Sequence, residues 1–159
     1  MRAARSATAA AGGGGPGDDP HVVELQPEAF AKLREAGEVL QCIDVREEWE
    51  HQTASLAGFQ LRPLSRMSEW CAARCCAWRG LDCEAVALTA CSLTHARRAP
   101  NIEEDFDKSE PVYVLCHHGV RSRSAANWLV SLGWVGTVYN ISGGIDAWTR
   151  RVDGSVPMY

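Results

Sequence analysis

The six residues from Cys116 to Arg121 carry the most reactive group of side chains in the sequence. They read Cys-His-His-Gly-Val-Arg and directly follow the apolar run Val112–Leu115. A strand that ends in cysteine, followed by a tight loop and a helix start, surrounds the sulfur with backbone N–H groups and the positive end of a helix dipole. Arg121 adds a permanent cation, and His117 and His118 can add more. Such surroundings favour the thiolate, which is the reactive form of cysteine.

A buried cysteine with no chemical role is the alternative interpretation of Cys116. The loop argues against it, because its polar residues and Gly119 contribute nothing to packing. Cys116 is therefore the predicted nucleophile. A metal site at His117 and His118 is not expected, because adjacent side chains in a tight loop diverge and no partner carboxylate stands nearby.

Short apolar runs and helical patterns alternate along the chain and must position this loop. Strands alternating with helices favour a parallel sheet covered on both faces. The nearly continuous apolar character of two of the runs is typical of strands that are buried on both sides. The expected strands are Val22–Leu25, Val39–Val45, Phe59–Leu61, Pro111–Leu115 and Thr137–Ile141, and the expected helices are Pro27–Ala36, Glu47–His51, Ser122–Leu132 and one through Ile145 and Trp148.

Length and composition favour one soluble domain preceded by a leader. The chain has 159 residues, enough for a single ordinary core. Residues 1–20 are predicted to be a disordered leader: an arginine-containing start without acids, which resembles part of a transit peptide, then a Gly-rich linker. The domain is expected over residues 21–159. A plastid is the favoured location, with mitochondrion and cytosol as the alternatives.

Charge and cysteine content restrict the class of protein. The net charge of −4 argues against binding nucleic acid through a basic surface, and no apolar stretch is long enough for a membrane span. The cysteines number seven, an odd count, which indicates a reducing compartment rather than a disulfide framework. Size alone predicts a monomer. The tryptophans Trp49, Trp70, Trp128, Trp134 and Trp148 are expected in or beside the core, and His21 and His51 in solvent.

A Cys-rich stretch at residues 71–98 interrupts the domain pattern. It shows neither a strand nor a persistent helical stripe, and structureless loops of this length are uncommon inside compact domains. Its cysteine spacings do not match paired zinc knuckles. Joining Trp70 directly to Ala99 would leave a short, smooth connection. We hypothesise that the insert is a retained intron or gene-model artefact.

Three motifs in order resemble those of the rhodanese family, in its plant-type single-domain form. They are IDVREEWE, VYVLCHHGVRS and VYNISGGIDAW, and the resemblance covers about Val22 to Tyr159 apart from the insert. It implies a small doubly wound α/β domain with a central five-stranded parallel sheet. It also implies that the cysteine carries sulfane sulfur as a persulfide. Matched position by position, Cys116 is the nucleophile, His117, His118, Gly119, Val120 and Arg121 form the cradling loop, Asp44 and Arg46 support it, and Gly143, Gly144 and Trp148 form the closing motif.

Loop length favours sulfur transfer over phosphate chemistry. Only four residues separate Cys116 from Arg121, a tighter ring than cysteine phosphatases need around a phosphoryl group. The resemblance thus implies a thiosulfate-type sulfurtransferase with no metal or organic cofactor. Its expected partners are a small anionic sulfur donor and a thiol, protein or cyanide acceptor. The alternatives are a catalytically weak binding or regulatory module and a splice or gene-model variant whose insert impairs folding. Asp44 and Arg46 could also be a plain salt bridge.

Overall fold

The computed structural model describes residues 21–39, 41–70 and 102–159, and within them five parallel strands form one sheet in the order β1-β5-β4-β2-β3. This confirms the predicted α/β class and the five-stranded parallel sheet. The strands are β1 (Val22–Leu25), β2 (Gln41–Asp44), β3 (Gln60–Leu61), β4 (Val112–Leu115) and β5 (Val138–Ile141). The helices are α1 (Pro27–Glu35), α2 (Glu48–Thr53), the 3-10 helix η1 (Leu64–Glu69), α4 (Ile102–Asp105), α5 (Val120–Ser131) and α6 (Gly144–Arg151).

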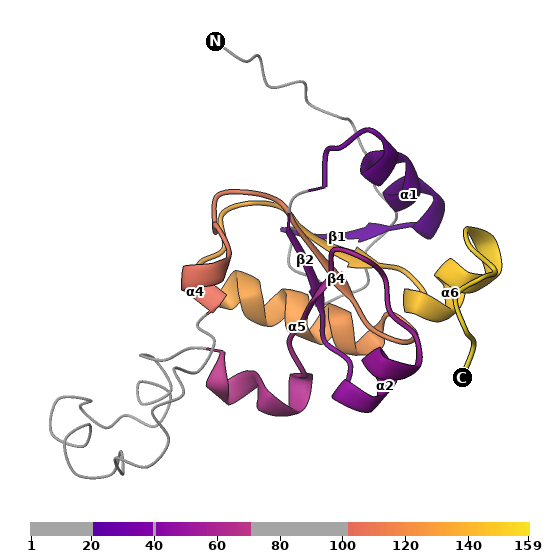
Figure 1. Ribbon diagram of the computed structural model, residues 1–159. Coiled ribbons are helices and arrows are strands. Elements are labelled where there is room, and N and C mark those ends of the chain that lie inside the picture. Colours follow the sequence, from indigo (N-terminus) through magenta and orange to yellow (C-terminus); the bar gives the residue numbers. More distant parts are fainter. Residues whose placement is uncertain (1–20, 40, 71–101) are drawn as a thin grey trace, which may run out of the picture.

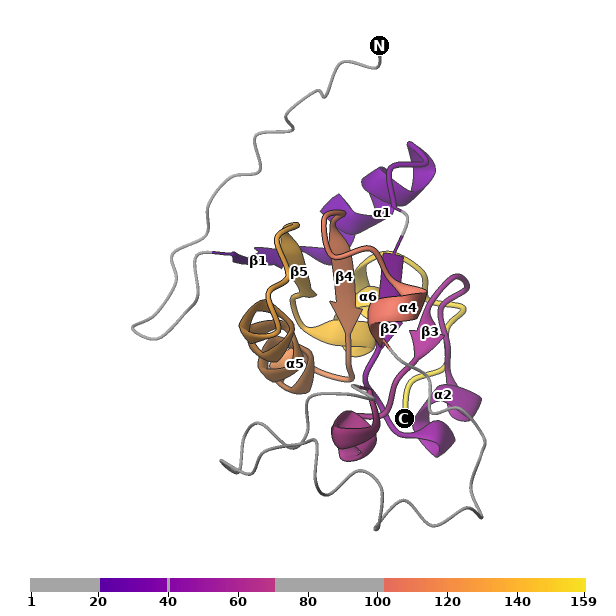
Figure 2. The same cartoon turned by 90° about the vertical axis from the view of Figure 1, so that its left-hand side faces the viewer.

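The central strand β4 is buried on both of its faces. Val112 and Val114 belong to one apolar cluster, and Tyr113 and Leu115 belong to another. Helix α5 contributes to the first cluster, whereas α1 and α6 contribute to the second. Figures 1 and 2 show these helices on opposite sides of the sheet. Cover on both faces explains why every residue of β4 is apolar or aromatic, as predicted.

The Cys116 loop and the Asp44–Arg46 segment leave the sheet at the same edge. They follow β4 and β2, which are paired in parallel with Asp44 opposite Leu115. From β4 the chain passes through α5 to β5, and from β2 it passes through α2 to β3 on the other side. In open α/β sheets, ligands bind at the carboxyl ends of strands whose connections diverge in this way. The topology alone therefore predicts a ligand site at this edge of the sheet.

The chain on either side of residues 71–101 meets at one point. The carbonyl of Trp70 accepts a hydrogen bond of 2.8 Å from the N–H of Ile102. Both side chains are buried, with 1% and 0% exposed. Trp70 also packs edge-on against Trp128 of α5, with 5.5 Å between ring centroids. These two residues thus anchor the ends of the interruption in the core.

Several expectations about single elements need revision. Helix α5 begins at Val120, two residues before the predicted Ser122, and η1 and α4 were not expected. Trp49 is 62% exposed rather than at the core. His51 is not isolated in solvent, since its Nδ1 lies 2.9 Å from a carboxylate oxygen of Asp44. The predicted leader and the insert lie outside the described residues. No helix in the described part of the chain is long and apolar enough to cross a membrane.

Candidate active site

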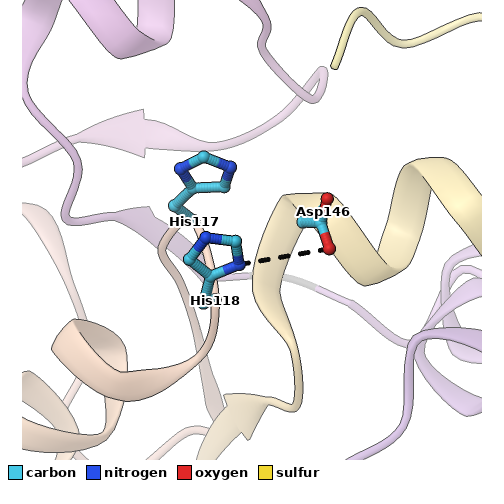
Figure 3. A group of neighbouring side chains, drawn as sticks. All are labelled: His117, His118 and Asp146. Atoms are coloured by element: carbon cyan, nitrogen blue, oxygen red, sulfur yellow. Dashed lines mark ion pairs between the residues drawn. The ribbon is translucent and has the colours of Figure 1, made fainter. Parts of the chain in front are cut away.

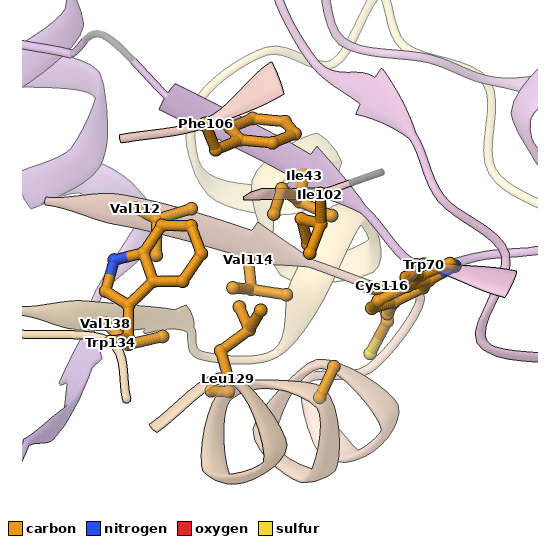
Figure 4. Close-up of a cluster of buried hydrophobic side chains, with 13 residues drawn as sticks. Ile43, Trp70, Ile102, Phe106, Val112, Val114, Cys116, Leu129, Trp134 and Val138 are labelled. Atoms are coloured by element: carbon orange, nitrogen blue, oxygen red, sulfur yellow. The ribbon is translucent and has the colours of Figure 1, made fainter. Parts of the chain in front are cut away.

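The sulfur of Cys116 lies at the junction of β4 and the start of α5. It accepts hydrogen bonds from the N–H of Gly119 at 3.1 Å and from the hydroxyl of Ser122 at 3.2 Å. The Cys116 residue is only 1% exposed, and it forms one end of the apolar cluster that also contains Trp70. Figure 4 shows its sulfur turned toward the helix beyond the sheet. The polar contacts all favour electron density on this sulfur, as the predicted nucleophile requires.

The first turn of α6 binds the backbone of the cysteine loop. The N–H of Ile145 donates to the carbonyl of Cys116 at 2.9 Å, and that of Asp146 donates to the carbonyl of His117 at 3.1 Å. A Cβ on Gly144 would lie 2.3 Å from both carbonyl oxygens. Only glycine therefore permits this approach. The predicted closing motif acts here by fixing the backbone of the cysteine loop.

The loop turns at Gly119, whose φ of 88° lies in the left-handed region. Its carbonyl accepts a hydrogen bond of 3.0 Å from Asn140 Nδ2, and the same amide donates to Glu24 at 2.6 Å. A Cβ at Gly119 would also lie 2.8 Å from the backbone nitrogen of Gly143. The turn that brings the Gly119 N–H to the sulfur is thus fixed from β1, β5 and the turn before α6. Val120, next in the loop, opens α5 with its side chain 72% exposed.

Arg121 forms a two-pronged ion pair with Glu50 of α2. Nη1 and Nη2 lie 2.7 and 2.5 Å from the two carboxylate oxygens. The Glu50 side chain is 4% exposed and that of Arg121 is 36% exposed. Burial by itself would raise the pKa of Glu50, but the hydrogen bonds from Arg121 and the Glu47 N–H and the charges of Arg121 and Arg46 lower this pKa to about 2. The carboxylate is therefore ionised at neutral pH.

Asp44 and Arg46 form a fully buried ion pair beside the loop. Arg46 Nη2 lies 2.6 Å from Asp44 Oδ2, and Arg46 Nε donates to the other oxygen at 3.0 Å. Nη2 also donates to the carbonyl of Ala54 at 2.8 Å, and Nη1 donates to the hydroxyl of Tyr159 at 2.6 Å. The pair is thus a salt bridge that anchors α2, and α2 carries Glu50 to Arg121. The pair is therefore a salt bridge, as one interpretation of the motif expects, and through α2 it is also connected to the site. Its effect on the chemistry of Cys116 stays a prediction.

His117 and His118 stack on one another instead of diverging as predicted. Their ring centroids lie 4.0 Å apart with an angle of 13° between planes, and His117 also stacks on Tyr159 at 4.4 Å. Burial and the neighbouring His118 lower the pKa of His117. His118 is exposed, and its Nδ1 lies 4.0 Å from Asp146 Oδ2. Figure 3 shows the two rings on the loop and Asp146 facing them from α6.

These three side chains are the described group closest to a metal site. One ligand atom from each lies within 4.8 Å of the others, so a carboxylate does stand near the histidines, contrary to expectation. A zinc ion bound at about 2.0–2.1 Å lies close to the plane of each imidazole ligand. Nearly parallel rings 4.0 Å apart have no such common point. As arranged, the group does not converge on an ion.

The structure brings the predicted site residues to one edge of the sheet and adds four that were missed. Cys116, the loop through Arg121, and the Asp44–Arg46 pair all lie there. The missed residues are Glu50, Ser122, Asn140 and Tyr159. Glu50 stands within the quoted motif and Ser122 within another, but no local pattern joins residues that are 71 positions apart, as Glu50 and Arg121 are. Ser122 had the clearest signal, because it stands in the first turn of the helix that follows the cysteine loop.

A doubly wound parallel sheet with a thiol in a glycine-containing loop at its carboxyl edge defines a cysteine-centred α/β domain. Residues 26–151 match the Rhodanese-like domain family, and the chain belongs to this family. A chloroplastic rhodanese-like and PpiC domain-containing protein 12 of Arabidopsis thaliana is 36% identical over 119 residues, which are 75% of this chain and 30% of the relative. The thiosulfate sulfurtransferase GlpE of Actinobacillus pleuropneumoniae is 47% identical over 47 residues, or 30% of this chain and 43% of that protein.

Solved structures agree on the fold. A rhodanese-like domain protein from Staphylococcus aureus superposes with a TM-score of 0.53 at 18% identity, covering 86% of this chain and 97% of that one. A thiosulfate sulfurtransferase from Pseudomonas aeruginosa gives 0.56 at 20% identity, covering 82% of this chain and 19% of that one. At such identities the likeness concerns the fold. The chain matches less than half the length of either curated relative described above.

Proposed function

We propose that the protein is a sulfurtransferase that carries sulfane sulfur on Cys116 as a persulfide. The observation that carries this proposal is the pair of hydrogen bonds that the Cys116 sulfur accepts, from the Gly119 N–H and the Ser122 hydroxyl. Both donors point at the position where negative charge resides on a thiolate, and such contacts strengthen when the acceptor is charged. The sulfurtransferases among its relatives and the family membership support the same activity.

The reaction is a double displacement in which electrons and atoms balance. The Cys116 thiolate attacks the outer sulfur of a donor such as thiosulfate, a new S–S bond forms, and the donor S–S bond breaks with its electron pair leaving on sulfite. An acceptor, a thiol or cyanide, then attacks the outer sulfur of the persulfide. The Cys116 thiolate departs with its electron pair and is ready for another cycle. No metal or organic cofactor takes part in these steps.

Mass spectrometry of the intact protein after incubation with thiosulfate tests the proposal. The wild type should gain the mass of one sulfur atom, cyanide should remove it with release of thiocyanate, and Cys116→Ser should gain nothing. Cys42→Ala is the matched control, because the Cys42 thiol is also buried and desolvation raises its pKa to about 12. This variant should behave as the wild type does. A folded wild type that takes up no sulfur would contradict the proposal and favour a binding module.

The location we propose is the plastid. Two observations support it: the arginine-containing, acid-free start of the sequence and the chloroplastic relative from Arabidopsis. Import into isolated chloroplasts, with protease protection of the imported chain, is the test. Import into mitochondria alone would overturn it.

A further inference from the structure

The guanidinium of Arg121 is already occupied by a carboxylate. Glu50 covers both of its terminal nitrogens at 2.7 and 2.5 Å, the geometry of a strong charge-assisted pair. A donor anion that used Arg121 would have to displace Glu50 or approach beside it. In either case the negative charge of the donor meets the negative charge of Glu50.

The guanidinium of Arg46, the second arginine of the site, is also paired with a carboxylate. Arg46 is 0% exposed and lies against the equally buried carboxylate of Asp44. Among the loop histidines, His118 lies 4.0 Å from the carboxylate of Asp146, and burial beside His118 lowers the pKa of His117. Each arginine charge at the described site therefore has a carboxylate partner. A dianion therefore gains little net attraction from these two arginines.

Exposed apolar side chains lie on the two helices that carry the ion pair. Trp49 directly precedes Glu50 and is 62% exposed, and Val120 directly precedes Arg121 and is 72% exposed. Tyr159 packs edge-on against Trp49 at 6.1 Å and stacks on His117 at 4.4 Å. These side chains offer contact area to an organic group rather than to a small oxyanion.

We infer that Glu50 is a specificity-determining residue that makes an organic hydropersulfide, R–S–S–H, a better sulfur donor than dianionic thiosulfate. The inference rests on the proposed sulfurtransferase function and names the donor class for the same site. The Cys116 thiolate attacks the outer sulfur, the donor S–S bond breaks, and R–S⁻ leaves with the electron pair while the transferred sulfur keeps its proton or its negative charge on Cys116. At neutral pH this donor is largely the monoanion R–S–S⁻, so it brings one negative charge toward Glu50 where thiosulfate brings two, and its R group can contact the exposed aromatic side chains beside the loop.

Glu50→Gln separates the charge of this residue from its shape. The amide oxygen can still accept from Arg121 and from the Glu47 N–H, which Glu50 now binds at 2.9 Å at the start of α2, so the helix cap is preserved. Only the negative charge is lost, and Arg121 becomes available to an anion. Glu48→Gln is the control, because it removes the same charge from an exposed position of the same helix.

The measurement is kcat/KM with cyanide as acceptor for two donors, the dianion thiosulfate and the hydropersulfide of N-acetylcysteine methyl ester, whose only ionisable group is the S–S–H itself. In Glu50→Gln we expect the value for thiosulfate to rise about tenfold, the effect of removing one like charge at a partly screened distance. The value for the hydropersulfide, which carries half the charge, should rise only about threefold, and Glu48→Gln should change neither. Because both donors are measured on one preparation, the ratio does not depend on the fraction of folded protein.

Each remaining outcome decides the question. An unchanged donor ratio in Glu50→Gln, with both donors active on the wild type, overturns the role of Glu50 and leaves the proposed function standing. A wild type that prefers thiosulfate also overturns it. A wild type that uses neither donor and forms no persulfide overturns the proposed function as well. If Glu50→Gln does not fold, Glu50→Asp keeps the charge but is too short for both nitrogens, and it should show a smaller rise in the same direction.

Discussion

The guanidinium of Arg46 and the hydroxyl of Tyr159 lie 2.6 Å apart, although 113 residues separate them in the sequence. Arg46 sits beyond β2 and is fully buried, whereas Tyr159 is 36% exposed and reaches the site from beyond α6. The same tyrosine stacks on His117 of the cysteine loop. One aromatic side chain therefore connects the Asp44–Arg46 pair with the loop that carries the nucleophile.

Tyr159→Phe should lower the free energy of unfolding by about 1–2 kcal/mol, since it removes the hydrogen bond from Arg46 and the longer one of 3.4 Å that the hydroxyl donates to Glu50, but keeps the ring on His117. Tyr159→Ala should cost about 1 kcal/mol more, because the ring contacts are also lost. Urea denaturation at neutral pH measures both values. Equal losses in the two variants would mean that the stack contributes nothing.

Gly144→Ala should destabilise the protein by about 2–4 kcal/mol and slow persulfide formation, because the added methyl group would overlap the carbonyls of Cys116 and His117. Gly37→Ala is the matched control. Gly37 has a similar positive φ of 71°, but a Cβ there meets nothing within 4 Å, so only the backbone cost of about 1 kcal/mol applies. Thermal unfolding and the sulfur-uptake assay together distinguish the two. Similar behaviour of both variants would contradict the close approach of α6.

Ser122→Ala should slow alkylation of Cys116 by iodoacetamide at neutral pH about two- to tenfold, the effect of losing one hydrogen bond to the sulfur. Ser124 lies in the same helix, and its hydroxyl contacts the carbonyl of Val120 instead. Ser124→Ala should therefore react at the wild-type rate. If the two variants alkylate equally fast, the hydroxyl of Ser122 does not stabilise the thiolate.

Glu50 should make the protein sensitive to acid in a defined range. Its folded-state pKa is lowered from 4.5 to about 2, so its contribution to stability is complete above pH 4.5 and is lost as the pH falls toward 2. The shift corresponds to about 3 kcal/mol. Urea titrations across this range should show a weaker pH dependence for Glu50→Gln than for the wild type. Parallel curves for the two proteins would be inconsistent with the ion pair to Arg121.

Deletion of residues 71–98 should leave the fold intact. In the shortened chain, Ala99, Pro100 and Asn101 would connect Trp70 to Ile102. The existing 2.8 Å hydrogen bond from the Ile102 N–H to the Trp70 carbonyl would then join residues four apart, the spacing of one helical turn. Far-ultraviolet circular dichroism and sulfur uptake should match those of the full chain or improve. Loss of both in the deletion variant would show that the insert is part of the folded domain.

The sequence predicted the elements that carry local signals. The apolar runs around Cys42 and Cys116 mark strands, and the Gly143-Gly144 turn marks the start of α6, because burial and turn formation depend on neighbouring residues. The sequence does not predict which residues pair when only the tertiary fold brings them together. Glu50 reads as one acid among several in a short helix, and nothing local distinguishes it from Glu48.

Trp49 and His51 also show where prediction from local sequence fails. Residue type predicts a core position for Trp49, yet the short helix α2 turns it outward while Glu50 turns inward toward Arg121. The sequence predicts a solvent-facing His51, yet the same helix brings its ring to Asp44. The face of a six-residue helix that is buried depends on a few long-range ion pairs, which hydrophobic patterning does not report.

The meeting of Trp70 and Ile102 also has a practical consequence for engineering. Trp70 and Ile102 are joined by a hydrogen bond and are buried in the same cluster. A guest sequence inserted between them would therefore be attached at two closely spaced, rigid points. Trp70 shares that cluster with Cys116. A fluorescent reporter whose own termini lie close together, inserted at this position, could therefore act as a biosensor for the loading of the cysteine with sulfur.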